Sequence, residues 1–209
     1  NMKNSYIALF PGQGSQSLGM LGEDSFADEQ DKKTILDCFS EASSVIGEDL
    51  WEITQNNLDK INETVYTQPI MLCADIAIWR VWQSYCDVKP LACAGHSLGE
   101  YAALVCAGVI SFSDAIKLVS RRANLMQEAV KGISTKMAAI IGLPADKVKS
   151  VCDGIEIEGE IVSIANYNSA LQTVIAGTEG AVLEACKASK EAGAKLAKPL
   201  AVSVPSHCS

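Results

Sequence analysis

One segment, Gly95-His96-Ser97-Leu98-Gly99, constrains the fold more than any other part of the chain. It has the Gly-x-Ser-x-Gly form of a nucleophile elbow, in which a strand turns sharply into a helix and leaves a serine hydroxyl exposed at the bend. The apolar run 91–94 before it is typical of a buried parallel strand. Residues 100–107 after it are typical of a helix that Gly108 ends. The pattern also fits an ordinary tight turn, in which Ser97 is only a small residue.

A nucleophilic serine needs a base, and the chain has two histidines, His96 and His207. His96 is adjacent to Ser97, so we expect its side chain to point elsewhere on such a turn. His207 is therefore the candidate base. The alternative is the structural or surface role that a lone histidine usually has. No acidic third member can be assigned from the sequence.

An arginine on an amphipathic helix is the second signal. Ser111 and Asp114 fit a capping box at the start of a helix that runs to about residue 130. On a helical wheel Arg122 falls within the apolar face, whereas Arg121 falls on the opposite, solvated side. An inward guanidinium requires an anionic partner, either an Asp or Glu of this chain or a substrate carboxylate. The apolar face consists of Ala115, Leu118, Val119, Met126 and Ala129.

A glycine-containing loop, residues 11–16, follows the apolar run 6–10. Such a loop presents backbone amides to an anion. It resembles a dinucleotide fingerprint but lacks the third glycine, because Ser17 occupies that position. It can instead supply one oxyanion-hole amide, with the amide of Leu98 as the second donor. An ordinary turn is the remaining interpretation.

Six segments together resemble the malonyl-CoA:acyl carrier protein transacylases of bacterial type II fatty acid synthesis, which are kin to polyketide synthase acyltransferase domains. The segments are Pro11-Gly-Gln-Gly-Ser-Gln16, Thr67-Gln68-Pro69, Gly95-His-Ser-Leu-Gly-Glu100, Gly142 after residues 137–141, Asn166-Tyr-Asn-Ser169 and Val204-Pro-Ser-His207. The resemblance implies that Ser97 is acylated, that His207 is its base and that Arg122 holds the malonyl carboxylate. It further implies oxyanion-hole amides at Gln13 and Leu98, and cleft residues at Gln68, His96, Asn166 and Asn168.

The resemblance also implies a reaction. A ping-pong enzyme moves malonyl from malonyl-CoA through a Ser97 acyl-enzyme to the phosphopantetheine thiol of acyl carrier protein. It needs no cofactor or metal and is expected to be a cytoplasmic monomer. The alternatives are a serine hydrolase or thioesterase with the same Ser-His pair, a nucleotide-binding protein built on loop 11–16, or an inactive fragment. Family members continue past the histidine through more core strands and helices, so we expect this chain to be a piece of the enzyme.

Composition limits the partners. The net charge of −8 argues against nucleic acid and anionic membranes. Acyl carrier proteins are themselves acidic, so docking needs a local basic patch, for which Lys187, Lys190, Lys195 and Lys198 are the candidates. A solvated lysine-bearing helix face is the alternative. The eight cysteines form no C-x-x-C pair, which favours reduced core thiols over metal ligands or disulfides.

The element pattern predicts an α/β fold in two parts. Residues 1–131 are expected to form an α/β-hydrolase-like parallel-sheet core, with helices near 34–46 and 70–86 and Pro69 at the first position of the second helix. Residues 132–202 are expected to form a ferredoxin-like βαββαβ subdomain. Its strands are predicted at 137–142, 161–167, 172–176 and 195–202, and its helices at 144–153 and 179–192. Residues 203–209 are expected to return to the core with His207, and the C-terminal part of the core is expected to be absent.

Overall fold

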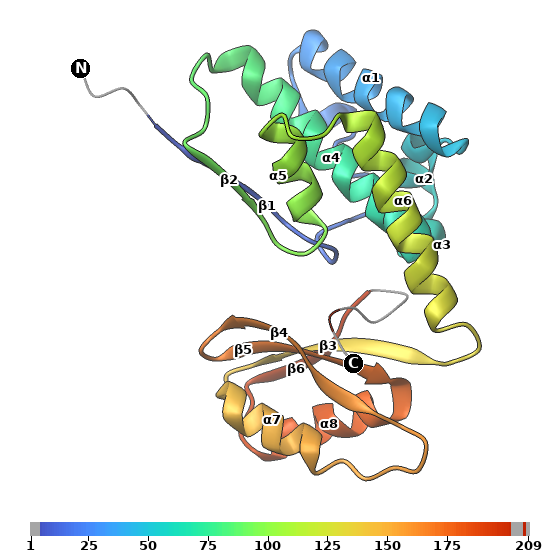
Figure 1. Cartoon of the computed structure of the whole chain (residues 1–209), viewed down its shortest axis with the longest axis vertical. Coiled ribbons are helices and arrows are strands. Elements are labelled where there is room, and N and C mark those ends of the chain that lie inside the picture. The colour runs from blue at the N-terminus through green and yellow to red at the C-terminus, as the bar shows by residue number, and fades with distance from the viewer. Residues whose placement is uncertain (1–4, 202–206, 208–209) are drawn as a thin grey trace. The chain divides into compact units, whose positions relative to one another are not determined.

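The computed structural model describes residues 5–201 and residue 207 of the chain (Figure 1). The chain divides into two units, residues 1–124 and 125–209. The first unit holds two strands, β1 (Ile7–Phe10) and β2 (Ala92–Gly95), which pair in parallel with Ile7 opposite Ala92 and Phe10 opposite Gly95. The predicted parallel arrangement of the strands before the glycine loop and before the elbow is therefore confirmed.

Helices account for most of the first unit. Among the described residues they are a 3-10 turn (Glu23–Ser25), α1 (Glu29–Ile46), α2 (Leu50–Asn56), α3 (Leu58–Ile61), α4 (Thr64–Tyr85), α5 (Gly99–Cys106) and α6 (Phe112–Ala129), which continues past residue 124. Helix α1 begins where the Asp28 carboxylate accepts hydrogen bonds from two backbone amides, and it ends at Gly47, whose φ is 80°. Helices α2 and α3 had no counterpart among the predicted elements.

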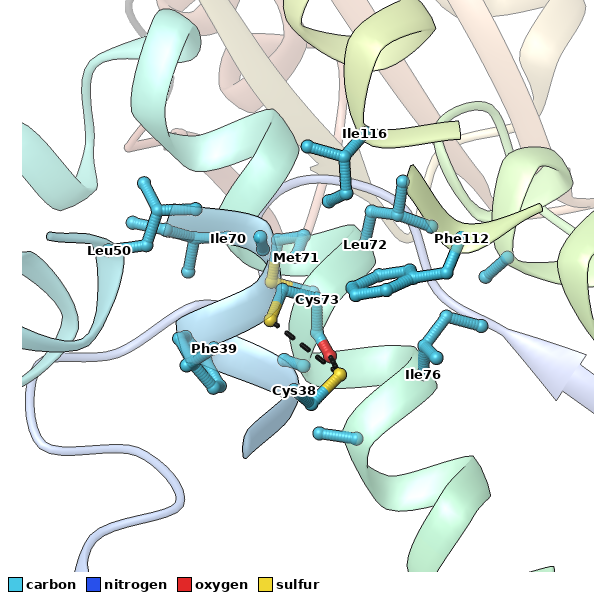
Figure 2. Packing of buried hydrophobic residues seen from close by; sticks show 14 of the residues in the cluster. Cys38, Phe39, Leu50, Ile70, Met71, Leu72, Cys73, Ile76, Phe112 and Ile116 are labelled. Atoms are coloured by element: carbon cyan, nitrogen blue, oxygen red, sulfur yellow. Dashed lines mark hydrogen bonds between the residues drawn. The ribbon is translucent and has the colours of Figure 1, made fainter. Parts of the chain in front are cut away.

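The core of the first unit forms where α1 and α4 pack together, with contributions from α2 and α6 (Figure 2). The rings of Phe39 and Trp51 meet edge to face with centroids 5.1 Å apart. Cys38 and Cys73 face each other within this core, and the Cys38 thiol donates to the Cys73 carbonyl oxygen at 3.6 Å. The expectation of a helix near residues 70–86 is confirmed, since α4 runs to Tyr85; it is buried from Thr67 to Ala77, whereas Ile78 and Trp82 are exposed.

Pro69 lies inside α4, so its predicted place at the first helical position is wrong. The helix begins at Thr64, more than a turn earlier than expected. Pro69 is the sixth residue of the helix, where it removes the amide that would otherwise donate to the carbonyl oxygen of residue 65. The start at Thr64 was not predicted because Glu63, the residue before it, is not one of the types favoured at a helix N-cap.

The second unit has the predicted β-α-β-β-α-β order. Its elements are β3 (Thr135–Ile141), α7 (Ala145–Asp153), β4 (Val162–Ser169), β5 (Gln172–Thr178), α8 (Glu179–Glu191) and β6 (Leu196–Pro199). The four strands form an antiparallel sheet in the order β4-β5-β3-β6, and α7 and α8 pack on one face of it (Figure 1). Ile140, Ile175 and Val182 are fully buried between the sheet and these helices. None of the helices described is both long and apolar enough to cross a bilayer.

Candidate active site

Ser97 lies on a sharp strand-to-helix turn. Strand β2 ends at Gly95 and α5 begins at Gly99, so three residues reverse the direction of the chain. Ser97 has a φ of 55°, in the left-handed region that few residues other than glycine adopt. Such strain persists only where the surrounding structure holds the backbone in place. The predicted elbow geometry is present.

Close backbone packing holds the turn. A Cβ atom on Gly95 would overlap the carbonyl group of Gly99, and one on Gly99 would overlap the carbonyl oxygen of Phe10. A Cβ atom on Gly12, in the glycine loop, would lie 2.8 Å from the carbonyl oxygen of His96. The His96 amide donates to the Phe10 carbonyl oxygen at 3.0 Å, which ties the elbow to the end of β1. The glycines at these positions therefore bring the loop after β1 against the nucleophile turn.

Arg122, on α6, reaches the hydroxyl of Ser97. Its Nη2 donates to Ser97 Oγ at 3.1 Å, and its Nη1 donates to Gln68 Oε1 at 2.6 Å. Gln68 lies on α4 and its side chain is fully buried. Both partners are neutral, and among the described residues Arg122 forms no ion pair with an Asp or Glu. A half-buried guanidinium without an acidic partner retains its attraction for an anion.

Thr64 links these groups to the glycine loop. Its Oγ1 accepts a hydrogen bond from Gln68 Nε2 at 2.9 Å and another from Gln13 Nε2 at 2.9 Å. Gln16 Nε2 donates to Asn62 Oδ1 at 3.0 Å, a second tie between the loop and the residues before α4. Thr64 was not among the predicted site residues. Its place four residues before Gln68, on the same face of one helix, was the signal that could have found it.

Two backbone amides are the candidates for an oxyanion hole. Leu98 is buried at the N-terminus of α5, where the helix dipole favours negative charge. Gln13 lies in the loop after β1, which packs against the elbow. Within residues 5–201 neither amide donates a backbone–backbone hydrogen bond. Both amides belong to the first unit, as does Ser97.

The remaining predicted residues lie elsewhere. His96 is exposed on the turn itself. His207 is exposed and has a φ of 59°, but it belongs to the second unit, so its pairing with Ser97 stays a prediction. Asn166 and Asn168 lie on β4 of the second unit. Residues 202–206, 208 and 209, with most of the Val-Pro-Ser-His motif and Cys208, lie outside the described residues.

The four candidate docking lysines are all exposed. Lys187 and Lys190 lie on α8, Lys198 lies on β6, and Lys195 directly precedes β6. Lys190 Nζ donates to the Lys195 carbonyl oxygen at 3.2 Å, so the end of the helix and the start of the strand are adjacent.

Known proteins share this sequence and fold. The model of the acyl transferase domain matches residues 7–209. The malonyl CoA-acyl carrier protein transacylases of Haemophilus influenzae and Escherichia coli K12 are each 50% identical, over 205 and 204 residues, which is 97% of this chain and 64% of each relative. The chain therefore spans about 64% of the length of these relatives.

Solved structures agree with the sequence relatives. The malonyl CoA-acyl carrier protein transacylase of Coxiella burnetii matches with a TM-score of 0.87 and 47% identity, covering 99% of this chain and 64% of that one. A malonyl-transacylase solved in complex with a type II PKS acyl-carrier protein matches with a TM-score of 0.87 and 50% identity, covering 99% of this chain and 65% of that one. The chain belongs to the acyl transferase domain family.

Proposed function

We propose that this chain carries the serine nucleophile of a malonyl-CoA:acyl carrier protein transacylase. One observation carries the proposal: Arg122 Nη2 lies 3.1 Å from the Oγ of a serine held in a left-handed elbow conformation. A nucleophile beside a guanidinium suits an acyl group that ends in a carboxylate, because the planar donors bind carboxylate oxygens in pairs. The names of the relatives, which are malonyl transacylases, support the same substrate.

The first half-reaction acylates the serine. His207 takes the Ser97 proton as Oγ attacks the thioester carbonyl carbon, and the amides of Gln13 and Leu98 stabilise the oxyanion. The tetrahedral intermediate collapses, the carbon–sulfur bond breaks and His207 returns the proton to the departing coenzyme A thiolate. A malonyl ester of Ser97 remains.

The second half-reaction runs in the opposite direction. The phosphopantetheine thiol of acyl carrier protein gives its proton to His207 and attacks the ester carbonyl carbon. The carbon–oxygen bond breaks and Ser97 Oγ recovers the proton. No cofactor enters either half.

Gln68 and Thr64 position Arg122 in this scheme. The buried Gln68 accepts from Nη1 and is itself oriented by its donation to Thr64. This arrangement leaves the Nη2 edge of the guanidinium toward Ser97, where the malonyl carboxylate would replace the hydroxyl as its partner. His96, Asn166 and Asn168 remain candidates for contacts with the rest of the substrate.

We further propose an α/β-hydrolase-like core over residues 1–131, a ferredoxin-like subdomain over 132–202 and a return to the core over 203–209. The antiparallel order β4-β5-β3-β6, joined by two helices on one face, supports the ferredoxin-like assignment. The parallel β1–β2 pair and the elbow support the hydrolase-like one. Acyl carrier protein would dock on the exposed lysines of α8 and β6, and the enzyme would act as a cytoplasmic monomer.

The test is the fate of the acyl group. After incubation with malonyl-CoA, intact mass should rise by one malonyl group, and peptide mapping should place it on Ser97. The labelled protein should be stable in water and discharge to the thiol of carrier protein. Label on a cysteine would overturn the role of Ser97, and rapid discharge to water would identify a hydrolase instead. Ser97→Ala should take up no label.

A further inference from the structure

Two thiols lie close together on the two elements that flank the nucleophile elbow. Cys93 lies on β2, two residues before Gly95, and Cys106 is the last residue of α5. Their Sγ atoms are 3.1 Å apart, although the residues are 13 positions apart in the sequence. A disulfide needs sulfurs at about 2.05 Å. A displacement of about 1 Å would therefore join the strand before Ser97 to the end of the helix after it.

Both cysteine residues are partly exposed to solvent in the described part of the chain. Cys93 and Cys106 are half-buried and line a cavity of about 640 Å³, together with Cys86. Cys93 also lines a second cavity of about 550 Å³, whose other walls come from Ala94, Gly95 and α5. A small oxidant can therefore approach Cys93.

The other close cysteine pair, Cys38 and Cys73, differs in both the distance between its sulfurs and its exposure. The Sγ atoms of Cys38 and Cys73 are 4.0 Å apart, and both residues are fully buried in the core between α1 and α4 (Figure 2). An oxidant cannot reach them without unfolding. This pair serves as an internal reference for the accessible one.

We propose that Cys93 and Cys106 form a reversible disulfide, a redox modification site that joins β2 to the end of α5, the two elements that flank the Ser97 turn. The oxidant is a peroxide. The Cys93 sulfur attacks one peroxide oxygen, the oxygen–oxygen bond breaks, and the sulfenic acid of Cys93 forms with release of one water. The Cys106 sulfur then attacks the Cys93 sulfur, the sulfur–oxygen bond breaks, and the Cys106 proton leaves with the hydroxide as a second water.

The order of the two thiols follows from their surroundings. Burial, and the hydrogen bond with Cys93, raise the pKa of the Cys106 thiol to about 12, which keeps Cys106 protonated. Cys93 lines both cavities and Cys106 only one. Cys93 is therefore the thiol that meets the oxidant, and Cys106 resolves it. Two thiols and one peroxide give one disulfide and two waters, and a dithiol reductant reverses the change.

The experiment maps the bond in the purified protein. The protein is treated with a stoichiometric amount of hydrogen peroxide, its free thiols are alkylated and it is digested without reductant. We expect a peptide in which Cys93 is joined to Cys106, lighter by two hydrogen atoms than the sum of its parts. Dithiothreitol should return both thiols. The melting temperature should rise on oxidation by about 5–10 °C, because the bond restricts the unfolded chain.

Three variants sharpen the result. Cys93→Ser and Cys106→Ser should each abolish the cross-linked peptide and the rise in melting temperature. Cys86→Ser, which changes a third thiol of the same cavity, should leave both unchanged. A bond from Cys93 to Cys86, sulfinic acid on Cys93 without a bond, or full alkylation of both thiols after peroxide would overturn the proposal. The mapping of the unmodified protein decides the matter even if a serine variant fails to fold.

Discussion

The guanidinium of Arg122 holds two neutral partners while it lies beside the candidate nucleophile. Gln68 accepts from one nitrogen and Ser97 from the other. Neutral partners orient the guanidinium without neutralising its charge, so Arg122 can still bind an anionic ligand. A carboxylate built into the chain at this place would compete with that of the substrate.

Gln68→Glu tests this competition. The new carboxylate would accept from Arg122 in place of the amide oxygen and neutralise its charge. We expect kcat/KM for malonyl-CoA to fall about tenfold or more, as 1.4 kcal/mol of competition would produce, with little change for acetyl-CoA. Gln68→Met, which is neutral and of similar length, is the matched control. Equal losses in the two variants would show that only the hydrogen bonds of Gln68 matter.

A second residue-scale feature is the carboxyl group of Asp75, which is buried in α4. Its Oδ2 has no hydrogen-bond partner among the described residues, and burial raises its pKa to about 7. The folded state therefore retains the Asp75 proton over a pH range in which the unfolded chain, with an ordinary Asp pKa of about 3.9, has lost it. Asp75 therefore makes the folded protein more stable at low pH than at neutral pH, and this contribution is lost as the pH rises from about 4 to 7.

Asp75→Asn should remove that pH dependence. Between pH 5 and pH 8 the variant should become increasingly more stable than the unmodified protein. The difference in their free energies of unfolding should reach about 4 kcal/mol at most. Urea denaturation across this range measures it. Asp146→Asn, at an exposed position on α7, should show no such trend. A difference that is constant with pH would mean that Asp75 is ionised in the folded protein throughout.

At the scale of elements, the features that could be predicted from the sequence are those that depend on neighbouring residues rather than on distant ones. The β-α-β-β-α-β order of the second unit and the capped start of α6, where the Asp114 amide donates to Ser111 Oγ at 3.0 Å, were predictable because each depends on neighbouring residues. The wheel for α6 placed Arg121 outward and Arg122 inward, and both placements are confirmed. It was wrong about Leu118, which is 50% exposed, and about Ala129, which is also exposed, because periodicity does not show how wide or how long the covered face is.

The site itself was predictable only in part. The elbow is local, and its glycines and left-handed serine follow from one five-residue pattern. The partner of Arg122 could not be read from the helical wheel, because Gln68 lies 54 residues away in the sequence. Thr64 was missed for the same reason, since its link to Gln13 joins residues 51 positions apart.

At the scale of the whole molecule, charge would govern the approach of the proposed partner, acyl carrier protein. The chain carries a net charge of −8, so an acidic partner meets general repulsion and needs a local basic surface. Exposed lysines on α8 and β6 provide positive charge on the second unit. This surface should affect the carrier-protein half-reaction more than acylation by malonyl-CoA.

Charge reversal at Lys187 and Lys195 tests this difference. The double change to Glu should raise KM for acyl carrier protein severalfold and leave the acylation rate with malonyl-CoA unchanged, because rim charges act mainly on association. Added salt should reduce the difference in KM for acyl carrier protein between the variant and the unmodified protein. The control is a double variant at Lys147 and Lys131, which changes net charge equally at other exposed positions. Equal effects in both variants would indicate general repulsion and remove the proposed docking surface.

The most direct test of the whole account is kcat/KM of Arg122→Ala for malonyl-CoA and acetyl-CoA, with thermal melting measured on the same samples. Loss of the guanidinium should lower the malonyl value by about 10²–10³, as expected for a carboxylate left unpaired in a partly buried site. Acetyl transfer should change little, and Arg122→Lys should recover only part of the malonyl rate because an ammonium lacks the planar donors. A parallel loss for both substrates with a lowered melting temperature would contradict the account and make Arg122 a structural residue.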